Sequence, residues 1–382
     1  MRVAVVVRSL KIGGMERIAV NLSESFAKDG HEAHLIYFKS KDKSFTAIAP
    51  VQMHHFDLEK SLMLTGIGLI LHVFSKWFNI LFRQTYYFWQ GLFLAPIFRY
   101  KLRKIEKQHG KFDLIIMRGH GTFEFTWPLK DERIVQMIES IFVAHGSTQM
   151  DFYLRRMYNG KNIACVSNGV KQRVEKAVKI ANASPKRIDI INNPLNVPLI
   201  QEQANDYLPH LKEKYIVSVT RMDPNKNIAL LVDAYAYARE HLNLRHKLVI
   251  VGDGNQRASI ETKIKTYAIE EHVHLLGLLT NPFPWVKHAD LFALTSFAEG
   301  LPTVLLEALA CDTEIVAADG EGGIRDILKD ELSSHICSFD PKEYAKKMLE
   351  ILSKKEKTNT KKFLEPYLPS TIVNTYINKY LS

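Results

Sequence analysis

The chain has 382 residues, enough for about two domains, and 46% of them are hydrophobic, so buried cores can form. This composition excludes a disordered protein, and three scattered cysteines exclude a disulfide-stapled one. The net charge is +10, of which residues 1–200 carry +13 and residues 201–382 carry −3. The basic half predicts an anionic partner, such as a phosphorylated glycolipid, a membrane surface or nucleic acid, or it only improves solubility.

The first half of the chain alternates short apolar runs with segments of helical period. The run Val3–Val7 stops at Arg8, too short for a signal peptide, so we expect a buried first strand and a cytoplasmic protein. A glycine loop, a helix ending at Gly30 and a second strand follow. This order indicates βαβ units on a parallel sheet. Further strands are predicted at residues 112–117, 133–138, 162–167 and 188–193.

Residues 61–100 depart from this alternation because they are strongly apolar and aromatic, and the basic stretch KLRKIEK follows them. Their longest charge-free runs, 61–75 and 84–98, are shorter than the ~18–20 residues that span a bilayer. Aromatic rings beside basic residues favour a surface that lies on the membrane, and a pair of core helices is the alternative. We therefore predict a membrane-facing segment at 61–107 and a protein peripheral to the inner face of the membrane.

The second half restarts the βα pattern after a polar seam at residues 194–211, which contains three prolines. A helix is predicted over residues 227–242. Strands are predicted at residues 215–220, 246–254, 273–277, 291–296 and 314–319. Two such series predict an α/β protein with two doubly wound, Rossmann-like domains. The expected domains are 1–195, 196–368 and a C-terminal helix at 369–382 that crosses back to the first domain.

The stretch SFAEGLPTVLLEALA carries two glutamates at the end of a predicted strand. Glu299 lies at the strand's carboxyl end, where open α/β sheets bind ligands. Pro302 suits the first turn of a helix, whose amides from Leu301 to Thr303 could hold phosphate or sugar oxygens. Glu307 lies about one and a half turns along that helix. The two carboxylates would thus reach different parts of one extended ligand, or they are ordinary helix surface charges.

EGLPTVLLEALA resembles the E-x7-E motif of family-4 retaining glycosyltransferases with the GT-B architecture. Three other segments are similar to elements of that family: RMDPNKN at 221–227, the double-glycine loop GGMER at 13–17, and the later glycine turn GGIRDIL at 322–328. The resemblance covers nearly the whole chain and implies two Rossmann-like domains that face a cleft. The chain departs from the family at CDTE (311–314), where a glycine is usual, and at Asp326, where a glutamate is usual.

The resemblance implies that the second domain holds most of a nucleotide diphosphate sugar. Arg221 and Lys226 would neutralise the diphosphate unless they form a mere surface pair. Glu307 would hold the ribose hydroxyls, and Glu299 those of the sugar. The other donor-side residues would be Gly300, Leu301, Pro302, Thr303, Gly252 and, from the first domain, Gly13 and Gly14. For Gly252, an ordinary tight turn is an equal alternative.

The family also implies a catalytic histidine after a first-domain strand, close to the donor sugar. His145 is the candidate, to act with Glu299, although Glu139 at the end of a predicted strand could occupy that place. Arg118 and His120 follow another predicted strand and are expected, with Glu139, on the acceptor side. Their alternative role is to stabilise the loop.

The chain lacks the D-x-D motif, so we expect no metal and no other cofactor. It also lacks G-x-G-x-x-G after the first strand, which argues against a nicotinamide dehydrogenase. The predicted function is transfer of a hexose or N-acetylhexosamine, with retention, from a nucleotide diphosphate sugar (a UDP-sugar first) to a lipid-linked, lipopolysaccharide or capsule-type acceptor.

Two other functions compete with this prediction. One is another GT-B activity, such as a nucleotide-sugar epimerase. The other is a non-catalytic protein that binds lipid or nucleic acid through its basic half. Nucleic-acid binders interleave aromatic and basic residues, whereas the aromatic residues here gather in one apolar block. We therefore expect no nucleic-acid partner.

Overall fold

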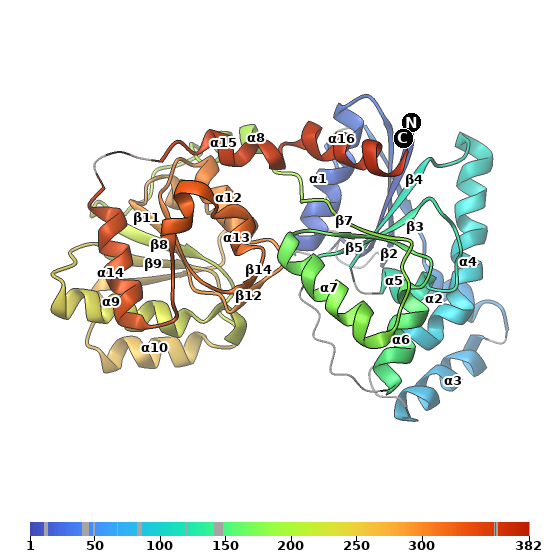
Figure 1. Cartoon of the computed structure of the whole chain (residues 1–382), viewed down its shortest axis with the longest axis horizontal. Coiled ribbons are helices and arrows are strands. Elements are labelled where there is room, and N and C mark those ends of the chain that lie inside the picture. The colour runs from blue at the N-terminus through green and yellow to red at the C-terminus, as the bar shows by residue number, and fades with distance from the viewer. Residues whose placement is uncertain are drawn as a thin grey trace. The chain divides into compact units, whose positions relative to one another are not determined.

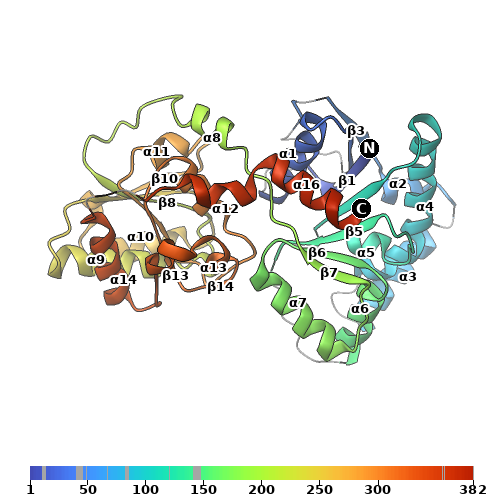
Figure 2. The same cartoon turned by 45° about the horizontal axis from the view of Figure 1, so that its top comes forward.

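The computed structural model describes residues 1–10, 14–39, 46–48, 50–66, 68–81, 86–119, 121–140, 148–354, 356 and 358–381. The chain forms two compact units, each with its own parallel sheet (Figure 1, Figure 2). The N-unit comprises Met1–Pro194 together with Pro369–Ser382, and the C-unit comprises Leu195–Leu368.

The N-unit is built on a seven-stranded parallel sheet in the order β3-β2-β1-β4-β5-β6-β7 (Figure 1). Its strands are β1 (Arg2–Ser9), β2 (Glu32–Lys39), β3 (Val51–His55), β4 (Leu114–Arg118), β5 (Ile134–Ile138), β6 (Asn162–Cys165) and β7 (Arg187–Ile190). Its helices are α1 (Gly14–Lys28), α2 (Leu58–Met63), α3 (Gly68–Leu81), α4 (Tyr86–His109), α5 (Thr122–Thr126), α6 (Thr148–Tyr158), α7 (Asn168–Ala181) and α16 (Pro369–Tyr380).

The central strands of this sheet match the sequence prediction because they are buried on both faces. Val3 to Val7 are at most 2% exposed, and every residue of β4 and β5 is buried. A strand covered on both faces is a continuous apolar run, which is recognisable in sequence. The edge strand β3 (VQMHH) was not predicted, because its residues are half-exposed or exposed and polar residues interrupt the apolar ones.

The C-unit has a six-stranded parallel sheet in the order β10-β9-β8-β11-β13-β15 and a two-stranded sheet, β12-β14. Its strands are β8 (Tyr215–Val219), β9 (Lys247–Val251), β10 (Val273–Gly277), β11 (Leu291–Leu294), β12 (Ala298–Glu299), β13 (Ile315–Ala318), β14 (Glu321–Gly322) and β15 (Ile336–Cys337). Its helices are α8 (Val197–Gln203), α9 (Ile228–His241), α10 (Arg257–Thr266), α11 (Phe283–Lys287), α12 (Thr303–Ala310), α13 (Ile324–Ile327), α14 (Pro341–Leu352) and α15 (Lys361–Leu364). The predicted α/β class with two doubly wound sheets is confirmed.

Two local features of the C-unit concern helix ends. The polar seam at 194–211 contains α8, which begins where the Asn196 side chain accepts a hydrogen bond from the Leu199 amide at 3.3 Å. The CDTE segment forms an unusual helix end, in which Asp312 rather than a glycine adopts the left-handed conformation at φ 56°. Its carboxylate accepts a hydrogen bond from Thr360 Oγ1 at 2.9 Å, and a short polar residue tolerates this backbone better than most others do.

The C-terminal helix α16 belongs to the N-unit. Tyr376 packs against Phe26 of α1 with ring centroids 5.9 Å apart, and both side chains are fully buried. Farther along the helix, Lys379 Nζ and the Tyr380 hydroxyl each lie 3.1 Å from the carboxylate of Asp189. Apolar burial and these polar contacts together fix α16 to its unit.

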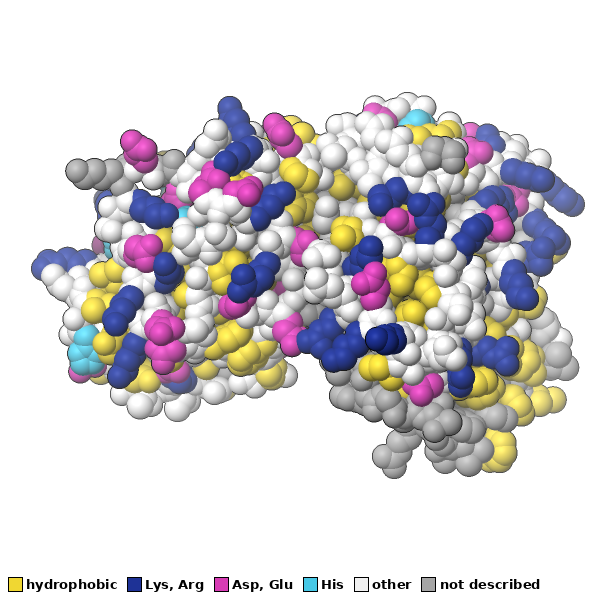
Figure 3. Space-filling view, viewed as in Figure 1, with side chains coloured by type: hydrophobic (Ala, Val, Ile, Leu, Met, Phe, Trp, Pro, Cys, Tyr) yellow, Lys and Arg dark blue, Asp and Glu magenta, His cyan; other side chains and the backbone are white. Residues whose placement is uncertain are grey.

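The apolar segment at 61–107 forms helices α2, α3 and α4. Several large apolar side chains of α3 point to solvent, with exposed fractions of 66% for Leu69, 68% for Ile70 and 57% for Val73. Figure 3 shows hydrophobic side chains gathered at the lower right, where α3 lies, and Lys and Arg side chains along the edge formed by α4. Among the described residues, no helix is both long enough and apolar enough to cross a membrane.

A histidine cluster joins the neighbouring strands β2 and β3, with His34 the third residue of β2 and His54 the fourth residue of β3. His34 Nδ1 is 2.8 Å from His54 Nε2, and His34 Nε2 is 3.0 Å from Glu32 Oε1. His34 Nε2–H therefore donates to the carboxylate, and His34 Nδ1 accepts from His54. Burial, with a smaller effect of the neighbouring His109, lowers the pKa of both rings, that of His54 to about 4. The folded N-unit thus holds both rings neutral.

We expect acid to destabilise the N-unit through His54. The pKa of His54 is depressed in the folded state, so the unfolded chain takes up a proton at this ring before the folded chain does. The free energy of unfolding is therefore unaffected by this ring above about pH 6.5 and decreases as the pH falls from there to about 4. A shift of this size corresponds to a loss on the order of 3 kcal/mol. Denaturant unfolding of His54→Gln, measured between pH 7 and pH 4, should show a flatter acid dependence than wild type. The exposed His241→Gln is the control, and an unchanged slope in His54→Gln would contradict this assignment.

Candidate active site

The candidate site of the C-unit lies where the direction of the chain across its sheet reverses. The strands β8, β9 and β10 proceed to one side of the sheet, and β11, β13 and β15 proceed to the other. The loops after the neighbouring strands β8 and β11 therefore diverge at the carboxyl edge of the sheet. Open α/β sheets bind ligands at such a point.

The loop after β8 presents two basic residues in different environments. Asp223 accepts a hydrogen bond from the Lys226 amide at 3.2 Å and begins the short 3-10 turn Pro224–Lys226. Its other carboxylate oxygen lies 3.1 Å from Arg221 Nη2, whose side chain is 77% exposed. Asp223 thus orients both residues, with Arg221 in solvent and Lys226 at the start of α9.

Lys226 and Glu299 form an ion pair between the two loops. Lys226 Nζ lies 2.6 Å from Glu299 Oε1, and their side chains are only 17% and 13% exposed. At this degree of burial the pair is screened less by solvent than a surface pair would be. The structure therefore brings together the carboxylate and the lysine that the resemblance assigned to the sugar and to the diphosphate of one donor.

Backbone contacts fix these loops to each other. Asn225 Nδ2 donates to the Ala298 carbonyl at 2.9 Å, and the Phe297 amide donates to the Asn225 carbonyl at 2.8 Å. Thr295 Oγ1 donates to the Lys226 carbonyl at 3.0 Å. Asn225, which sequence reasoning did not single out, therefore holds the Lys226 loop against the Glu299 loop.

A third loop, after β13, joins the same edge. Its strand β14 pairs in parallel with β12, and the Gly323 amide donates to the Glu299 carbonyl at 2.9 Å. Glu299 is thus held by its backbone from one side and by Lys226 from the other. The predicted later glycine turn begins at this contact.

The helix after Glu299 differs slightly from the prediction. It begins at Thr303, and the Thr303 amide donates to the Leu301 carbonyl at 2.9 Å, so that amide is already used within the turn. Leu301 and Pro302 are buried, and Gly300 is half-exposed. Glu307 is the fifth residue of the helix and is also half-exposed.

The structure gives Gly252 a packing role. At φ 134°, an added Cβ would lie 1.8 Å from the Thr220 carbonyl oxygen. An added Cβ at Gly254 would lie 2.4 Å from the Met222 carbonyl oxygen. Both glycines therefore let the backbone around Arg221 pass close to the end of β9, and this close approach explains Gly252 without a ligand.

In the N-unit, Arg118 and Glu139 meet at the carboxyl ends of β4 and β5. Arg118 Nη2 lies 2.9 Å from Glu139 Oε1 and donates to Asn193 Oδ1 at 2.7 Å. The Arg118 side chain is 1% exposed. These contacts join β4, β5 and the segment after β7, which favours the loop-stabilising role for Arg118 over direct contact with an acceptor.

Sequence reasoning missed two residues that interact with this pair, Asn193 through a hydrogen bond and Tyr376 electrostatically. Burial raises the pKa of Glu139 above its usual range, against the effect of Arg118, and the charge of Glu16 raises it further. Burial also raises the pKa of Tyr376, on which Arg118 and Glu139 act in opposite directions. The C-terminal helix therefore contributes a buried phenol that both members of the pair influence electrostatically, which no local pattern in the sequence indicates.

Three of the predicted site residues, His145, His120 and Gly13, lie outside the described residues. Gly14 begins α1, and an added Cβ there would meet nothing within 4 Å. In the part of the chain that the structure describes, no three His, Cys, Asp or Glu side chains are arranged to hold a metal ion.

The two doubly wound, Rossmann-like units make up the GT-B architecture that the motif resemblance implied. Two family models match the chain, "Glycosyltransferase Family 4" over residues 12–197 and "Glycosyl transferases group 1" over residues 200–362. Together they cover most of both units. The protein belongs to the family-4 glycosyltransferases, as the motif resemblance predicted.

Two curated relatives come from Campylobacter jejuni. One is named N-acetylgalactosamine-N,N'-diacetylbacillosaminyl-diphospho-undecaprenol 4-alpha-N-acetylgalactosaminyltransferase and is 37% identical over 161 residues, 42% of this chain and 43% of that enzyme. This match thus spans less than half of the relative's length. The other, an alpha-1,4-N-acetyl-D-galactosaminyltransferase acting on a diNAcBac-PP-undecaprenol glycan, is 24% identical over 354 residues, 92% of this chain and 89% of that enzyme.

Solved structures share the fold over the whole chain. HepE of Anabaena, in complex with UDP, has a TM-score of 0.71 at 18% identity, covering 100% of this chain and 99% of that one. Sucrose-phosphate synthase of Thermosynechococcus elongatus has a TM-score of 0.70 at 16% identity, covering 100% and 98%. At these identities the likeness establishes the architecture alone.

Proposed function

We propose that this glycosyltransferase moves a sugar from a UDP-sugar to a lipid-linked glycan acceptor, with retention of configuration and without a metal ion. The Lys226–Glu299 pair at the switch point of the C-unit carries this proposal, because it places a cation and a sugar-binding carboxylate 2.6 Å apart. The UDP complex of HepE supports the nucleotide. The names of the two Campylobacter enzymes support a lipid diphosphate acceptor and an N-acetylhexosamine donor.

The residues of the C-unit suit departure of a diphosphate. As negative charge grows on the leaving group, Lys226 compensates it from a partly buried position and Arg221 from solvent. Lys226 would then share its charge between the diphosphate and Glu299, whose carboxylate accepts hydrogen bonds from the sugar hydroxyls. Attack by the acceptor from the same face on an oxocarbenium-like state would retain the configuration. In this proposal Glu139 is the acceptor-side carboxyl group of the N-unit.

Donor hydrolysis tests this proposal. The protein is incubated with UDP-N-acetylgalactosamine and with a panel of other UDP-, GDP- and ADP-sugars, with and without EDTA, and nucleotide release is measured. We expect slow release from one UDP-sugar that EDTA does not change. With a lipid-linked acceptor, NMR should show the same anomeric configuration in product and donor. If the folded protein neither binds nor turns over any donor, the transferase proposal fails.

We further propose that the N-unit lies on an anionic membrane through the exposed apolar side of α3. Leu69 and Ile70 are 66% and 68% exposed, and exposed cations follow on α4: Arg99, Arg103, Lys104 and Lys107. Apolar side chains at the headgroup level beside basic residues bind anionic lipid surfaces. This surface would keep a lipid-linked acceptor and the enzyme in one plane.

Vesicle binding tests the membrane proposal. Leu69→Ser/Ile70→Ser should weaken binding to phosphatidylglycerol-containing vesicles by at least about 10-fold, since two apolar side chains no longer enter the interface. The control Leu208→Ser/Leu278→Ser removes two leucines of the C-unit that are 79% and 78% exposed. Equal binding by both variants would contradict a role for α3.

A further inference from the structure

A cavity of about 860 Å³ lies in the N-unit, away from the Arg118–Glu139 pair of that unit. Its lining comes from the connection between α5 and β5 (residues 127–132) and from the C-terminal half of α6 with the turn that follows (152–161). These segments lead into the amino ends of β5 and β6. The candidate site residues Arg118 and Glu139 lie at the carboxyl ends of their strands, so the cavity is at the opposite edge of the sheet.

Positive charge predominates in this cavity. Four of its lining residues are cations: Lys130, Arg155, Arg156 and Lys161. Only two are acids, Asp131 and Glu132. A volume of this size is in the range of small-molecule sites, which reach about 1,000 Å³.

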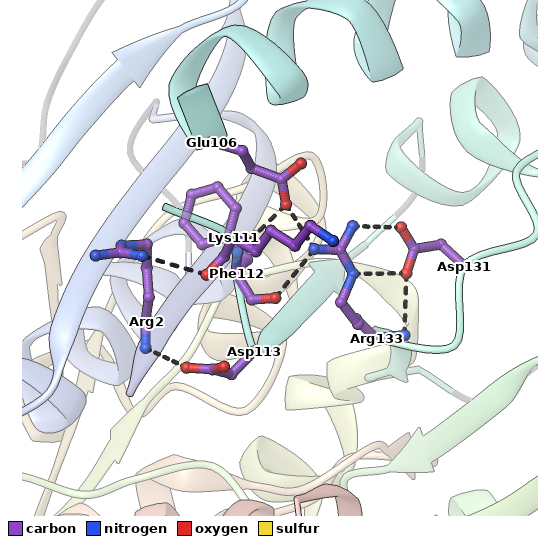
Figure 4. A network of polar contacts seen from close by, with 7 residues as sticks. All are labelled: Arg2, Glu106, Lys111, Phe112, Asp113, Asp131 and Arg133. Carbon is purple, nitrogen blue, oxygen red and sulfur yellow. Dashed lines mark hydrogen bonds and ion pairs between the residues drawn. The ribbon is translucent and has the colours of Figure 1, made fainter. Parts of the chain in front are cut away.

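The two acids are neutralised from outside the cavity. The carboxylate of Asp131 accepts hydrogen bonds from Arg133 Nε and Nη2 at 2.9 and 2.7 Å, and Arg133 also pairs with Glu106 (Figure 4). Glu132 lies 3.1 Å from Lys186 Nζ and is 85% exposed. Neither Arg133 nor Lys186 lines the cavity, so the two acids have cationic partners outside it, and the lining cations outnumber the lining acids by four to two.

One of these cations is buried with no carboxylate partner among the described residues. Lys161 is 9% exposed, and its Nζ donates to the backbone carbonyl of Leu129. Burial and the charge of Lys130 together lower its pKa to about 8, although the charge of Asp131 acts in the opposite direction. A buried ammonium group is costly unless a counter-charge is present, and an anion in the cavity would supply one.

Aromatic side chains form the other wall. Trp127 stacks on Phe88 at a centroid distance of 4.7 Å and donates its indole N–H to the Phe88 carbonyl, so its ring is fixed. The guanidinium group of Arg156 lies 5.2 Å above the ring of Phe152. The cation is thereby held at the cavity wall by an aromatic face.

We propose that this cavity binds a phosphate-bearing ligand, with Arg155, Arg156 and Lys161 as the phosphate contacts. Guanidinium groups bind phosphate in a bidentate manner, and a buried lysine adds a point charge. The phosphate is either that of an anionic lipid headgroup or that of a free phosphorylated metabolite. This site is separate from the donor and acceptor sites proposed above, because it shares no residue with them.

The test compares two charge-matched double variants. Arg155→Gln/Arg156→Gln removes two exposed cations of the cavity, and Lys176→Gln/Lys179→Gln removes two exposed cations of α7 that do not line it. Binding of inorganic phosphate and pyrophosphate is measured by calorimetry. Binding to vesicles of phosphatidylcholine, with and without phosphatidylglycerol, is measured by sedimentation. Donor hydrolysis is followed in parallel and should be unchanged in both variants.

We expect the cavity variant to lose at least about 10-fold in affinity for the phosphate probe, and the α7 variant to bind as wild type does. Loss of phosphate or pyrophosphate binding identifies a soluble ligand. Loss restricted to phosphatidylglycerol vesicles identifies a lipid headgroup, since the α3 surface is common to all three proteins. If wild type binds none of the probes, or both variants weaken binding equally, the proposal is overturned.

Discussion

The variant Glu299→Gln is expected to lose about 100-fold to 1,000-fold in kcat/KM with the natural donor, a barrier increase of about 3–4 kcal/mol. Glutamine preserves the shape of the side chain but removes the charge that pairs with Lys226 at 2.6 Å. It also replaces a charged acceptor of sugar hydroxyls by a neutral one, and charge-assisted hydrogen bonds are roughly twice as strong. Steady-state kinetics together with thermal unfolding separate this effect from a folding defect.

The partner variant sharpens this test. Lys226→Met should lose a similar factor in kcat/KM. The double variant Lys226→Met/Glu299→Gln should lose less than the product of the two single losses, because the effects of residues in direct contact are not additive. Arg325→Met is the matched control. It also breaks an arginine–carboxylate pair, with Asp319 at 2.6 Å, but its side chain is 66% exposed. The control should stay within about threefold of wild type, and a loss equal to that of Lys226→Met would contradict a specific role for the Lys226–Glu299 pair.

The variant Gly252→Ala is expected to prevent stable folding of the C-unit. The new methyl group would lie 1.8 Å from the Thr220 carbonyl oxygen, and φ is 134°, where residues with a Cβ are strained. The obstacle is backbone rather than a flexible side chain, so relief requires displacement of the segment that carries Arg221. The loss in the free energy of unfolding should exceed about 4 kcal/mol, which is the upper range for single substitutions.

Gly277→Ala is the control for this prediction. Gly277 also has a positive φ, 70°, and accepts a hydrogen bond from the Gly252 amide, but its added Cβ would meet only Arg257 Nη1, at 3.9 Å. Gly277→Ala should lower the free energy of unfolding by only about 1–2 kcal/mol, because an alanine is less stable than a glycine in the left-handed conformation. Soluble yield and denaturant unfolding measure both variants. Wild-type stability of Gly252→Ala would show that the close approach of the two backbones is wrong.

Elements with a local sequence signal were predictable, and elements that depend on distant partners were not. The strands β1, β4 and β8 were predicted because each is a short apolar run between turn residues. The edge strand β3 was not predicted, because its stability comes from pairing with β2 and not from an apolar pattern of its own. In this pairing His34 lies opposite Gln52. The helix after Glu299 was predicted, but not that its Thr303 amide is already engaged within the first turn.

For the candidate site, residue types were predictable and their partners were not. Arg118 was predicted as an acceptor-side residue, but its burial at 1% and its contacts with Glu139 and Asn193 depend on strands far apart in the chain. Tyr376 comes under the electrostatic influence of this pair only because α16 returns to the N-unit after the whole C-unit has been completed. The pattern of apolar residues in α16 does not indicate that Tyr376 interacts with Arg118 and Glu139.

The sequence by itself determined the α/β class, the two successive βα series and the family, because these depend on local periodicity and on short motifs read in order. Only the tertiary structure decided which loops meet. Lys226 and Glu299 lie 73 residues apart, and they pair because β8 and β11 are neighbours in the sheet. Burial and partnering are properties of that packing, so the role of Gly252 and the unbalanced charge around Lys161 became visible only in three dimensions.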